Sequence, residues 1–234
     1  MLTPTLGQNG LGKRSRLHAL VRSFELKPLA SGAALFALNF LKHPQMLGTI
    51  FPSSRFLAAR VLSRIPWDRC KVIVEYGPGV GQITMEILRR MNADAVLVGI
   101  ELNRDFVRYL RRTIRDLRLQ LICGSAAEVR TVLQRLGHAN ADCVIAGIPF
   151  SRVERLQRRE ILSETHAALA EDGRLTVYQY SRTVQTDLEQ TFGRVERERE
   201  FVNFVPAQLF HCVKRAAASS RTRNGVAPCV QRGD

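Results

Sequence analysis

The sequence lacks any run of about 18 apolar residues, so it predicts no membrane-spanning helix. It has no Cys-x-x-Cys pair, and its five cysteines do not show the spacing of metal ligands. Most of them lie inside apolar runs. We therefore expect a reduced, cytosolic protein with cysteines in its core and no metal site.

Acidic residues are also scarce. The chain has 21 Asp and Glu against 35 Lys and Arg, which gives a formal net charge of +14. Such a charge predicts attraction to a polyanion, either nucleic acid or an anionic membrane surface. About 45% of the 234 residues are hydrophobic, which is enough for one domain with a sizeable core and excludes a wholly disordered chain.

The two ends of the chain differ from its middle. Over residues 13–27, Leu17, Leu20, Val21 and Phe24 would share one face of a helix, and most of the basic residues would lie off that face. Such a helix either lies in a membrane interface or packs on the domain with a solvated basic side. The basic segment 216–234 contains Gly and Pro, and we expect it to be poorly ordered.

Between the ends, strand and helix patterns alternate from residue 71. Strands are predicted at 71–76, 95–101, 119–123, 141–147, 174–180, 194–203 and 208–214, and helices at 81–91, 103–117, 126–136, 153–170 and 183–190. This order is typical of an α/β fold with a mostly parallel seven-stranded sheet and helices on both faces. Ligands of such sheets bind at the carboxyl ends of the strands.

The most specific motif is a glycine loop at the end of the first predicted strand. It reads Glu75-Tyr76-Gly77-Pro78-Gly79-Val80-Gly81 and opens a helix with free N–H groups. A second acid, Glu101, closes the next strand, where it can accept both hydroxyl hydrogens of a ribose. No Gly-Lys-Ser/Thr follows the loop, which argues against a P-loop hydrolase, and the spacing misses the nicotinamide-dinucleotide fingerprint by one residue.

These motifs resemble the Rossmann-like, class I S-adenosylmethionine-dependent methyltransferases. The resemblance implies S-adenosylmethionine as cofactor, with its methionine part on the three glycines of the loop and its ribose on Glu101. The family's Gly-Asp-Ala motif, which meets the adenine, reads Gly124-Ser125-Ala126 here, so a neutral Ser125 replaces the acid. The full set of expected cofactor-binding residues is Glu75, Gly77, Gly79, Gly81, Glu101, Leu102, Ser125, Ala126 and Gly147.

The end of the fourth predicted strand bears on the identity of the methyl acceptor. It reads IAGIPF over residues 145–150. It resembles the Asn/Asp-Pro-Pro-Tyr/Phe motif of adenine-N6 methyltransferases, but Gly147 replaces the polar residue that binds the target amine. That replacement disfavours a nucleobase and leaves room for a bulkier amine. Phe150 is expected to hold a cationic amine by cation–π attraction or, alternatively, to form only a wall of the cofactor pocket.

A second resemblance covers about residues 38–214. The segment FLKHPQMLGTIFPSSRFLA at 40–58, the Gly-Ile-Pro at 147–149 and the segment NFVPAQLF at 203–210 are similar to blocks of the bacterial phospholipid N-methyltransferases. That family makes phosphatidylcholine from phosphatidylethanolamine and docks on membranes through an N-terminal amphipathic helix. The resemblance implies three parts: membrane-associating helices at 1–45, the methyltransferase domain at 46–215 and a basic tail at 216–234.

The expected reaction is the attack of a neutral amine on the sulfonium methyl group. No His–acid pair marks a general base, and Tyr178 or Tyr180 is expected to contact the amine unless both serve only strand packing. The expected partners are an anionic membrane surface and its phospholipid substrate, with the protein bound to the inner face of the membrane. The main alternative is a ribosomal RNA adenine N6-dimethyltransferase; a non-catalytic relative and a small-molecule methyltransferase are weaker ones.

Overall fold

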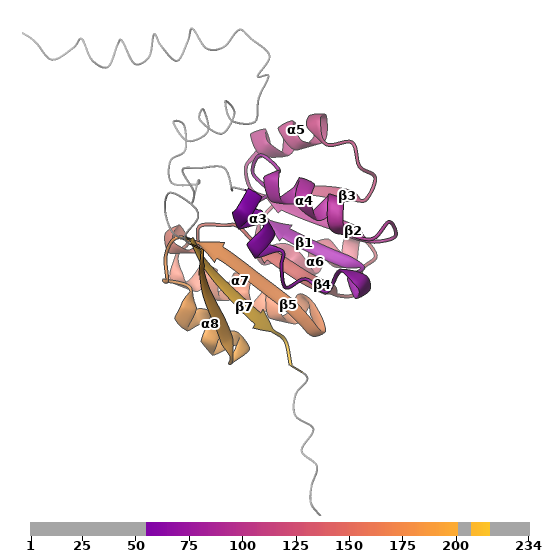
Figure 1. The fold of residues 1–234 in the computed structure, drawn as a ribbon. Coiled ribbons are helices and arrows are strands. Elements are labelled where there is room, and N and C mark those ends of the chain that lie inside the picture. Colours follow the sequence, from indigo (N-terminus) through magenta and orange to yellow (C-terminus); the bar gives the residue numbers. More distant parts are fainter. Residues whose placement is uncertain (1–54, 201–206, 216–234) are drawn as a thin grey trace, which may run out of the picture.

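The computed structural model describes residues 55–200 and 207–215 (Figure 1). One sheet runs through this part in the order β3-β2-β1-β4-β5-β7-β6. Its strands are β1 (Val72–Tyr76), β2 (Val96–Glu101), β3 (Leu119–Cys123), β4 (Ala141–Ala146), β5 (Leu169–Gln179), β6 (Val195–Glu200) and β7 (Ala207–Val213). The chain thus crosses over after β3, which places the turning point of the sheet between β1 and β4.

The first five strands pair in parallel, and β7 enters antiparallel between β5 and β6. The register brings Tyr76 level with Ile100 of β2 and with Ala146 of β4. Ala146 in turn is level with Val177 of β5. One residue beyond this row, the carboxyl ends of four neighbouring strands meet at a single edge, which we call the carboxyl edge.

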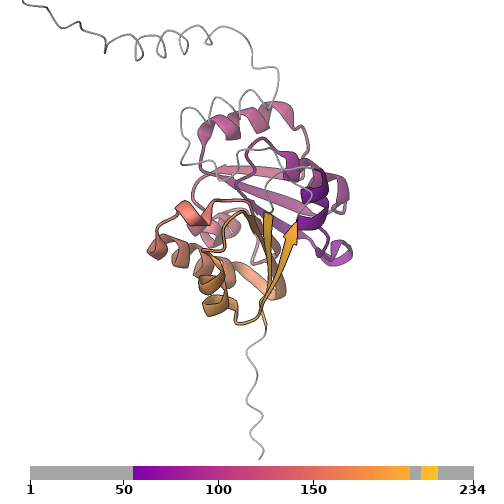
Figure 2. The ribbon, with the colours of Figure 1, turned by 60° about the vertical axis from the view of Figure 1, so that its left-hand side comes forward.

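Helices cover both faces of the sheet (Figure 2). They are α3 (Arg55–Val61), α4 (Gln82–Arg90), α5 (Arg104–Thr113), α6 (Val129–Arg135), α7 (Arg155–Ala168) and α8 (Gln185–Phe192), with short 3-10 turns η1 (Trp67–Arg69), η2 (Ala126–Glu128) and η3 (Phe150–Arg152). Alternate strand residues point to opposite faces, so each strand contributes side chains to two apolar layers. Ile73 and Leu97 pack with α3 and α4, whereas Val74 and Val98 pack with α6, α7 and α8.

The predicted α/β fold, with its mostly parallel seven-stranded sheet, is confirmed. Several bounds differ from the sequence-based prediction; for example, α5 ends at Thr113, four residues earlier than predicted. Helix α3 was not predicted, and β5 already begins at Leu169, where the predicted helix still continued. The pair Ala141–Leu169 and a register shift before Cys143 place this early part of β5 in the sheet, and Asp172 has a φ of 60° there.

The remaining expectations on chain organisation concern other residues. The predicted membrane-associating helices at 1–45 and the tail at 216–234 lie outside the described residues. So do residues 201–206, which include the last three residues of the predicted sixth strand. Within the described part, no helix has the length and apolar character needed to cross a membrane.

Candidate functional site

The predicted site residues that follow β1, β2 and β4 meet at the carboxyl edge. Gly77 N–H donates to the carbonyl of Ile100 (2.9 Å), and Gly147 N–H donates to the carbonyl of Tyr76 (2.9 Å). These bonds extend the parallel ladder by one step and bring Gly77, Glu101 and Gly147 to the same level. With about 4.8 Å between strands, the row is roughly 10 Å wide, which suits an elongated ligand lying across the strand ends.

The glycine loop between β1 and α4 takes the left-handed backbone that its sequence predicts. The φ angles are 70° at Gly77, 59° at Gly79 and 85° at Gly81. At Gly81 space is limiting as well, because a Cβ atom there would lie 2.6 Å from Leu110 Cδ2 of α5. Only glycine therefore satisfies both the turn and the packing of the loop against α5.

Glu101, at the end of β2, is held by backbone hydrogen bonds on both carboxylate oxygens. It accepts from the backbone N–H of Asn103 through Oε1 (2.8 Å) and from that of Gly79 through Oε2 (3.0 Å). Burial raises the pKa of its carboxyl, while these N–H donors act in the opposite direction. A carboxylate offers about four acceptor positions, so Glu101 has capacity left for the hydroxyl hydrogens of a ribose. This arrangement fits the predicted role.

Glu75 lies in β1, two residues before Gly77, and is fully buried. Thr84 of α4 donates its hydroxyl to Glu75 Oε2 (2.7 Å), and Oε1 has no hydrogen-bond partner within the described part. Burial raises the pKa of Glu75 to about 8, with the negative charge of Glu101 adding to the effect. This buried oxygen keeps an open acceptor position, and a cationic group bound at the nearby glycine loop would favour the charged form of Glu75.

The third motif is built around the short turn η2. Ser125 caps it: its hydroxyl oxygen accepts from Ala127 N–H (3.2 Å), and Glu128 Oε2 accepts from Ser125 N–H (3.1 Å). Ala126 is buried and Leu102 is exposed. Ser125 is therefore engaged in a capping box, with its hydroxyl hydrogen still available to a ligand.

Gly147 and Tyr178 lie directly against each other at the ends of β4 and β5. A Cβ atom at position 147 would overlap the hydroxyl oxygen and ring of Tyr178. Tyr178 is almost fully buried in the layer below α3 and α4, and Tyr180 packs at the margin of the same layer. The space that a larger residue at 147 would need is thus occupied by a phenol whose hydroxyl reaches the carboxyl edge.

Phe150 is placed differently from the two tyrosines. It is fully buried in the opposite layer, among residues that pack against α7. Its ring therefore packs in the core behind the sheet, and the structure does not bring it together with Tyr178. Proline at 149 and the turn η3 redirect the chain at this point, which the spacing in the sequence did not reveal.

Two supporting groups were missed by sequence reasoning. Asn103 caps α5 by accepting from Asp105 N–H (2.8 Å), which fixes the segment that donates to Glu101. Arg158 of α7 donates to the carbonyls of Phe150 and Val153 (both 3.3 Å) and binds the buried carboxylate of Asp187 of α8 (2.5 Å). The Asn103 cap has a local signal, an Asn directly before a helix, whereas the contacts of Arg158 with Asp187 depend on the fold.

Comparison with known proteins agrees with this geometry. Residues 73–173 match the family model described as "Methyltransferase domain". The match spans nearly all of β1, all of β2, β3 and β4 and the start of β5, and it includes the glycine loop, Glu101 and Gly147. The chain carries a class I S-adenosylmethionine-dependent methyltransferase domain. The predicted enzyme class, a methyltransferase with S-adenosylmethionine as its cofactor, is thereby confirmed.

A curated relative and several solved structures are similar to this methyltransferase. The relative is the ornithine lipid N-methyltransferase of Singulisphaera acidiphila, 28% identical over 180 residues, which are 76% of this chain and 94% of the relative. The N-methyltransferase NodS of Bradyrhizobium japonicum, solved with S-adenosyl-L-homocysteine, has a TM-score of 0.56 at 16% identity and covers 75% of this chain and 97% of its own.

A putative O-methyltransferase of Klebsiella pneumoniae has a TM-score of 0.58 at 13% identity, covering 86% of this chain and 97% of its own. At these identities the solved structures establish the shared fold. The cofactor itself fits the residues present: a left-handed glycine loop, a buried acid with free lone pairs and an unsatisfied Glu75 oxygen line one edge. When bound, S-adenosylmethionine supplies an electrophilic methyl group. No cluster of three metal-ligating side chains occurs among the described residues.

Proposed function

We propose that this methyltransferase transfers a methyl group to the amine of a membrane lipid headgroup, with phosphatidylethanolamine as the expected substrate. The observation that carries the proposal is the similarity to the ornithine lipid N-methyltransferase along 94% of that relative's length. Phosphatidylethanolamine and ornithine lipid both present a primary amine, so the shared chemistry is methylation of an amino lipid.

The acceptor end of the site supports a lipid amine over a nucleobase. Position 147 carries no side chain that could accept a hydrogen bond from an adenine amino group, and Tyr178 fills the adjacent space. The Tyr178 hydroxyl can accept from an ammonium or donate to a neutral amine. We infer that Tyr178 and Gly147 orient the amine nitrogen in line with the methyl group, which is the main task of the protein in such a displacement.

Exposed apolar side chains near the carboxyl edge also favour a lipid. Leu102 follows β2, Met85 lies in the first turns of α4, and Leu156 lies at the start of α7. Helix starts and strand ends share this edge of a parallel sheet. Three large exposed hydrophobic residues around one edge are suited to lipid chains or to the surface of a membrane. We propose the inner face of the cytoplasmic membrane as the place where the enzyme works.

The test is methyl transfer from labelled S-adenosylmethionine to three acceptors in parallel. These are vesicles with phosphatidylethanolamine, vesicles with ornithine lipid and unmethylated ribosomal RNA. Label in either lipid supports the proposal, and the more rapidly labelled lipid names the headgroup. Label in the RNA, or in none of the three while the cofactor still binds, would reject it.

Two variants show that the label depends on this site. Glu101→Ala removes the expected ribose contacts and should abolish transfer by weakening cofactor affinity about 100-fold, since two hydrogen bonds to a charged group are lost. Glu171→Ala removes an exposed carboxylate of β5 that pairs with Lys214 and should leave transfer unchanged. Unaltered cofactor binding in Glu101→Ala, measured by calorimetry, would show that the ribose assignment is wrong.

A further inference from the structure

A second pocket, with a different chemistry, opens on the sheet face that carries α3. Its volume is about 80 Å³, and it is lined by residues of β5, β6 and β7 and of the segments beside them. Room for a water molecule takes about 10–15 Å³ on this measure, so the pocket accepts a group of roughly five heavy atoms. Four arginines line it: Arg64, Arg174, Arg194 and Arg215.

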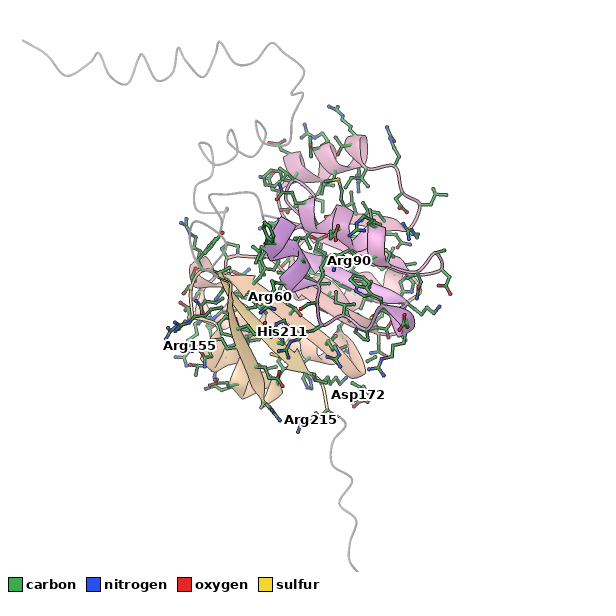
Figure 3. The ribbon with its side chains drawn as sticks, in the orientation of Figure 1. Arg60, Arg90, Arg155, Asp172, His211 and Arg215 are labelled. Carbon is green, nitrogen blue, oxygen red and sulfur yellow. The ribbon has the colours of Figure 1, made fainter. Side chains whose placement is uncertain are left out.

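The pocket lies well away from the acceptor end of the active site. Arg174 is paired with Val213 near the end of β7, and Tyr178 lies four residues further along β5. At about 3.3 Å per residue, the two positions are roughly 13 Å apart on one face of the sheet. The two carbons that separate phosphate from amine in an ethanolamine headgroup cannot span this distance. Figure 3 shows His211 on this face and Arg215 beyond the end of β7.

The charges of the pocket are not balanced within the described part of the chain. Glu196 is the carboxylate among the lining residues, so four arginines against one glutamate leave a charge of 4 − 1 = +3. Arg64 binds Glu196 and Glu198, Arg194 lies 3.6 Å from Glu196, and Arg60 offsets the charge of Glu198, so the single lining carboxylate is shared by two of the four arginines. His211 adds no charge near neutral pH, because burial and the nearby Arg64 lower its pKa to about 4.

Two buried nitrogen atoms in this pocket lack a hydrogen-bond partner within the described residues. Arg174 Nε is inaccessible to solvent and has no acceptor within the described residues. His211 is 7% exposed, its Nδ1 is bonded to the Thr176 hydroxyl (3.1 Å), and its Nε2 is likewise without a hydrogen bond. The carboxylate nearest to Nε2 is Glu198 at 3.9 Å. A buried guanidinium nitrogen without an acceptor is costly, and an anion in the pocket would remove that cost.

We propose that this pocket binds a phosphate group, carried by an anionic lipid other than the methyl acceptor or free in solution. Guanidinium groups match the tetrahedral oxygens of phosphate in pairs of hydrogen bonds, and here they come from four different segments around one small volume. The pocket holds the phosphate away from the methyl-transfer site, so the inference does not depend on which acceptor is methylated.

The first experiment measures the binding of inorganic phosphate to the full-length protein by calorimetry, with chloride at matched ionic strength as reference. Arg174→Gln should weaken phosphate binding at least about tenfold, since it removes a charged double donor. The matched control is Arg135→Gln, an exposed arginine at the end of α6 on the opposite side of the sheet, which should bind as the wild type does.

The double variant Arg194→Gln/Arg215→Gln guards against a folding defect. Both residues are exposed, so their replacement leaves the core intact. It should also weaken phosphate binding at least about tenfold. Phosphate that binds the wild type no better than chloride does, or an equal loss in Arg135→Gln, would overturn the proposal.

A second arm distinguishes the two sources of phosphate. Vesicles of phosphatidylglycerol in phosphatidylcholine are sedimented with the wild type, with the double variant and with Arg135→Gln. If only the double variant sediments less with the vesicles, and added inorganic phosphate lowers the sedimentation of the wild type, the pocket is assigned to a lipid phosphate. Unchanged sedimentation together with lost binding of inorganic phosphate assigns it to free phosphate. Both outcomes support a phosphate site.

Discussion

At the scale of single residues, two buried glutamates at neighbouring strand ends are in different electrostatic environments. Glu101 receives backbone N–H donors on both oxygens, which suits a carboxylate that remains charged when a ribose binds. Glu75 has a hydroxyl donor on one oxygen and none on the other, so in the ligand-free protein its neutral form is favoured. The bound cofactor would bring a positive charge that restores the carboxylate.

The first prediction concerns the pH dependence that Glu75 creates. Its pKa is raised from 4.5 to about 8 in the folded state, so its contribution to stability is complete below pH 4.5 and is lost as the pH rises through about 8. Glu75→Gln removes this titration. The free energy of unfolding of the ligand-free wild type should fall relative to the variant over this range, by at most about 5 kcal/mol. Denaturant unfolding at several pH values measures it.

Glu171→Gln is the control for this series, because the Glu171 carboxylate is exposed. This substitution should give the same pH profile of stability as the wild type. Parallel profiles of wild type and Glu75→Gln between pH 5 and about pH 8 would contradict the assigned protonation of Glu75.

The second prediction uses the contact between Gly147 and Tyr178. Gly147→Ala places a methyl group where the phenol lies and should cost about 1–3 kcal/mol of stability through overpacking, together with most of the methyl-transfer activity. Adding Tyr178→Leu shortens the opposing side chain. The double variant should regain stability while remaining inactive, as measured by thermal unfolding and by transfer of labelled methyl groups.

The two substitutions must therefore be non-additive in stability. If the double variant loses the sum of the two single losses, the two side chains do not compete for one space. If it regains full activity, Tyr178 does not orient the acceptor.

At the scale of elements, α7 and α8 are joined by a nearly dry ion pair that also holds the loop after β4. The side chains of Arg158 and Asp187 are 9% and 2% exposed, and Arg158 donates to two carbonyls of the loop that carries Pro149 and Phe150. Because Gly147 begins this loop, the pair connects the packing of two helices to the geometry of the acceptor site.

The third prediction follows from this connection. Asp187→Ala leaves Arg158 buried without its partner and should destabilise the protein by about 3–5 kcal/mol in denaturant unfolding. Glu86→Gln breaks the more exposed pairs of Glu86 with Arg89 and Arg90 on α4, and should cost less than about 1 kcal/mol. A loss in Asp187→Ala no larger than in Glu86→Gln would show that the buried pair contributes little.

The elements also show what the sequence can predict and where it fails. Periodicity located β1 and β4 to within a residue or two, because their apolar runs are short and bounded by charged residues and glycine. It assigned Leu169 to a helix, because the pairing with Ala141 of β4 is a long-range contact without a local signal. Helix α3 was missed for a different reason, because its seven residues are too few for a clear periodic pattern.

For the candidate site, the motifs located the backbone-defined positions better than the side-chain directions. Gly77, Gly81 and Glu101 lie where the loop and the strand end require them. Phe150 follows β4 and Tyr178 lies near the end of β5, yet the two side chains lie in opposite layers because the chain turns at Pro149. The arginine pocket joins segments more than 100 residues apart, so no spacing in the sequence could reveal it.

At the scale of the whole molecule, the charge of +14 is distributed over parts with different expected tasks. Some of the basic residues serve internal ion pairs, such as Arg64 with Glu196 and Arg158 with Asp187. Those of residues 13–27 belong to the predicted amphipathic helix, and others lie in the tail after residue 215. A membrane-bound enzyme would use the first of these two terminal sets, whereas general attraction to polyanions would use both.

The fourth prediction separates these two possibilities. Arg14, Arg16 and Arg22 are replaced by Gln in one variant, and Arg221, Arg223 and Arg232 in another, so each loses three charges and falls from +14 to +11. At about 1 kcal/mol for each basic residue near an anionic leaflet, the first variant should bind phosphatidylglycerol vesicles roughly 100-fold more weakly. The second should bind nearly as the wild type does, and both should retain cofactor binding.

Sedimentation of the vesicles at low and high salt measures these differences in binding, since salt screens only the electrostatic part. Equal losses in the two variants would mean that net charge, and no particular helix, brings the protein to the membrane.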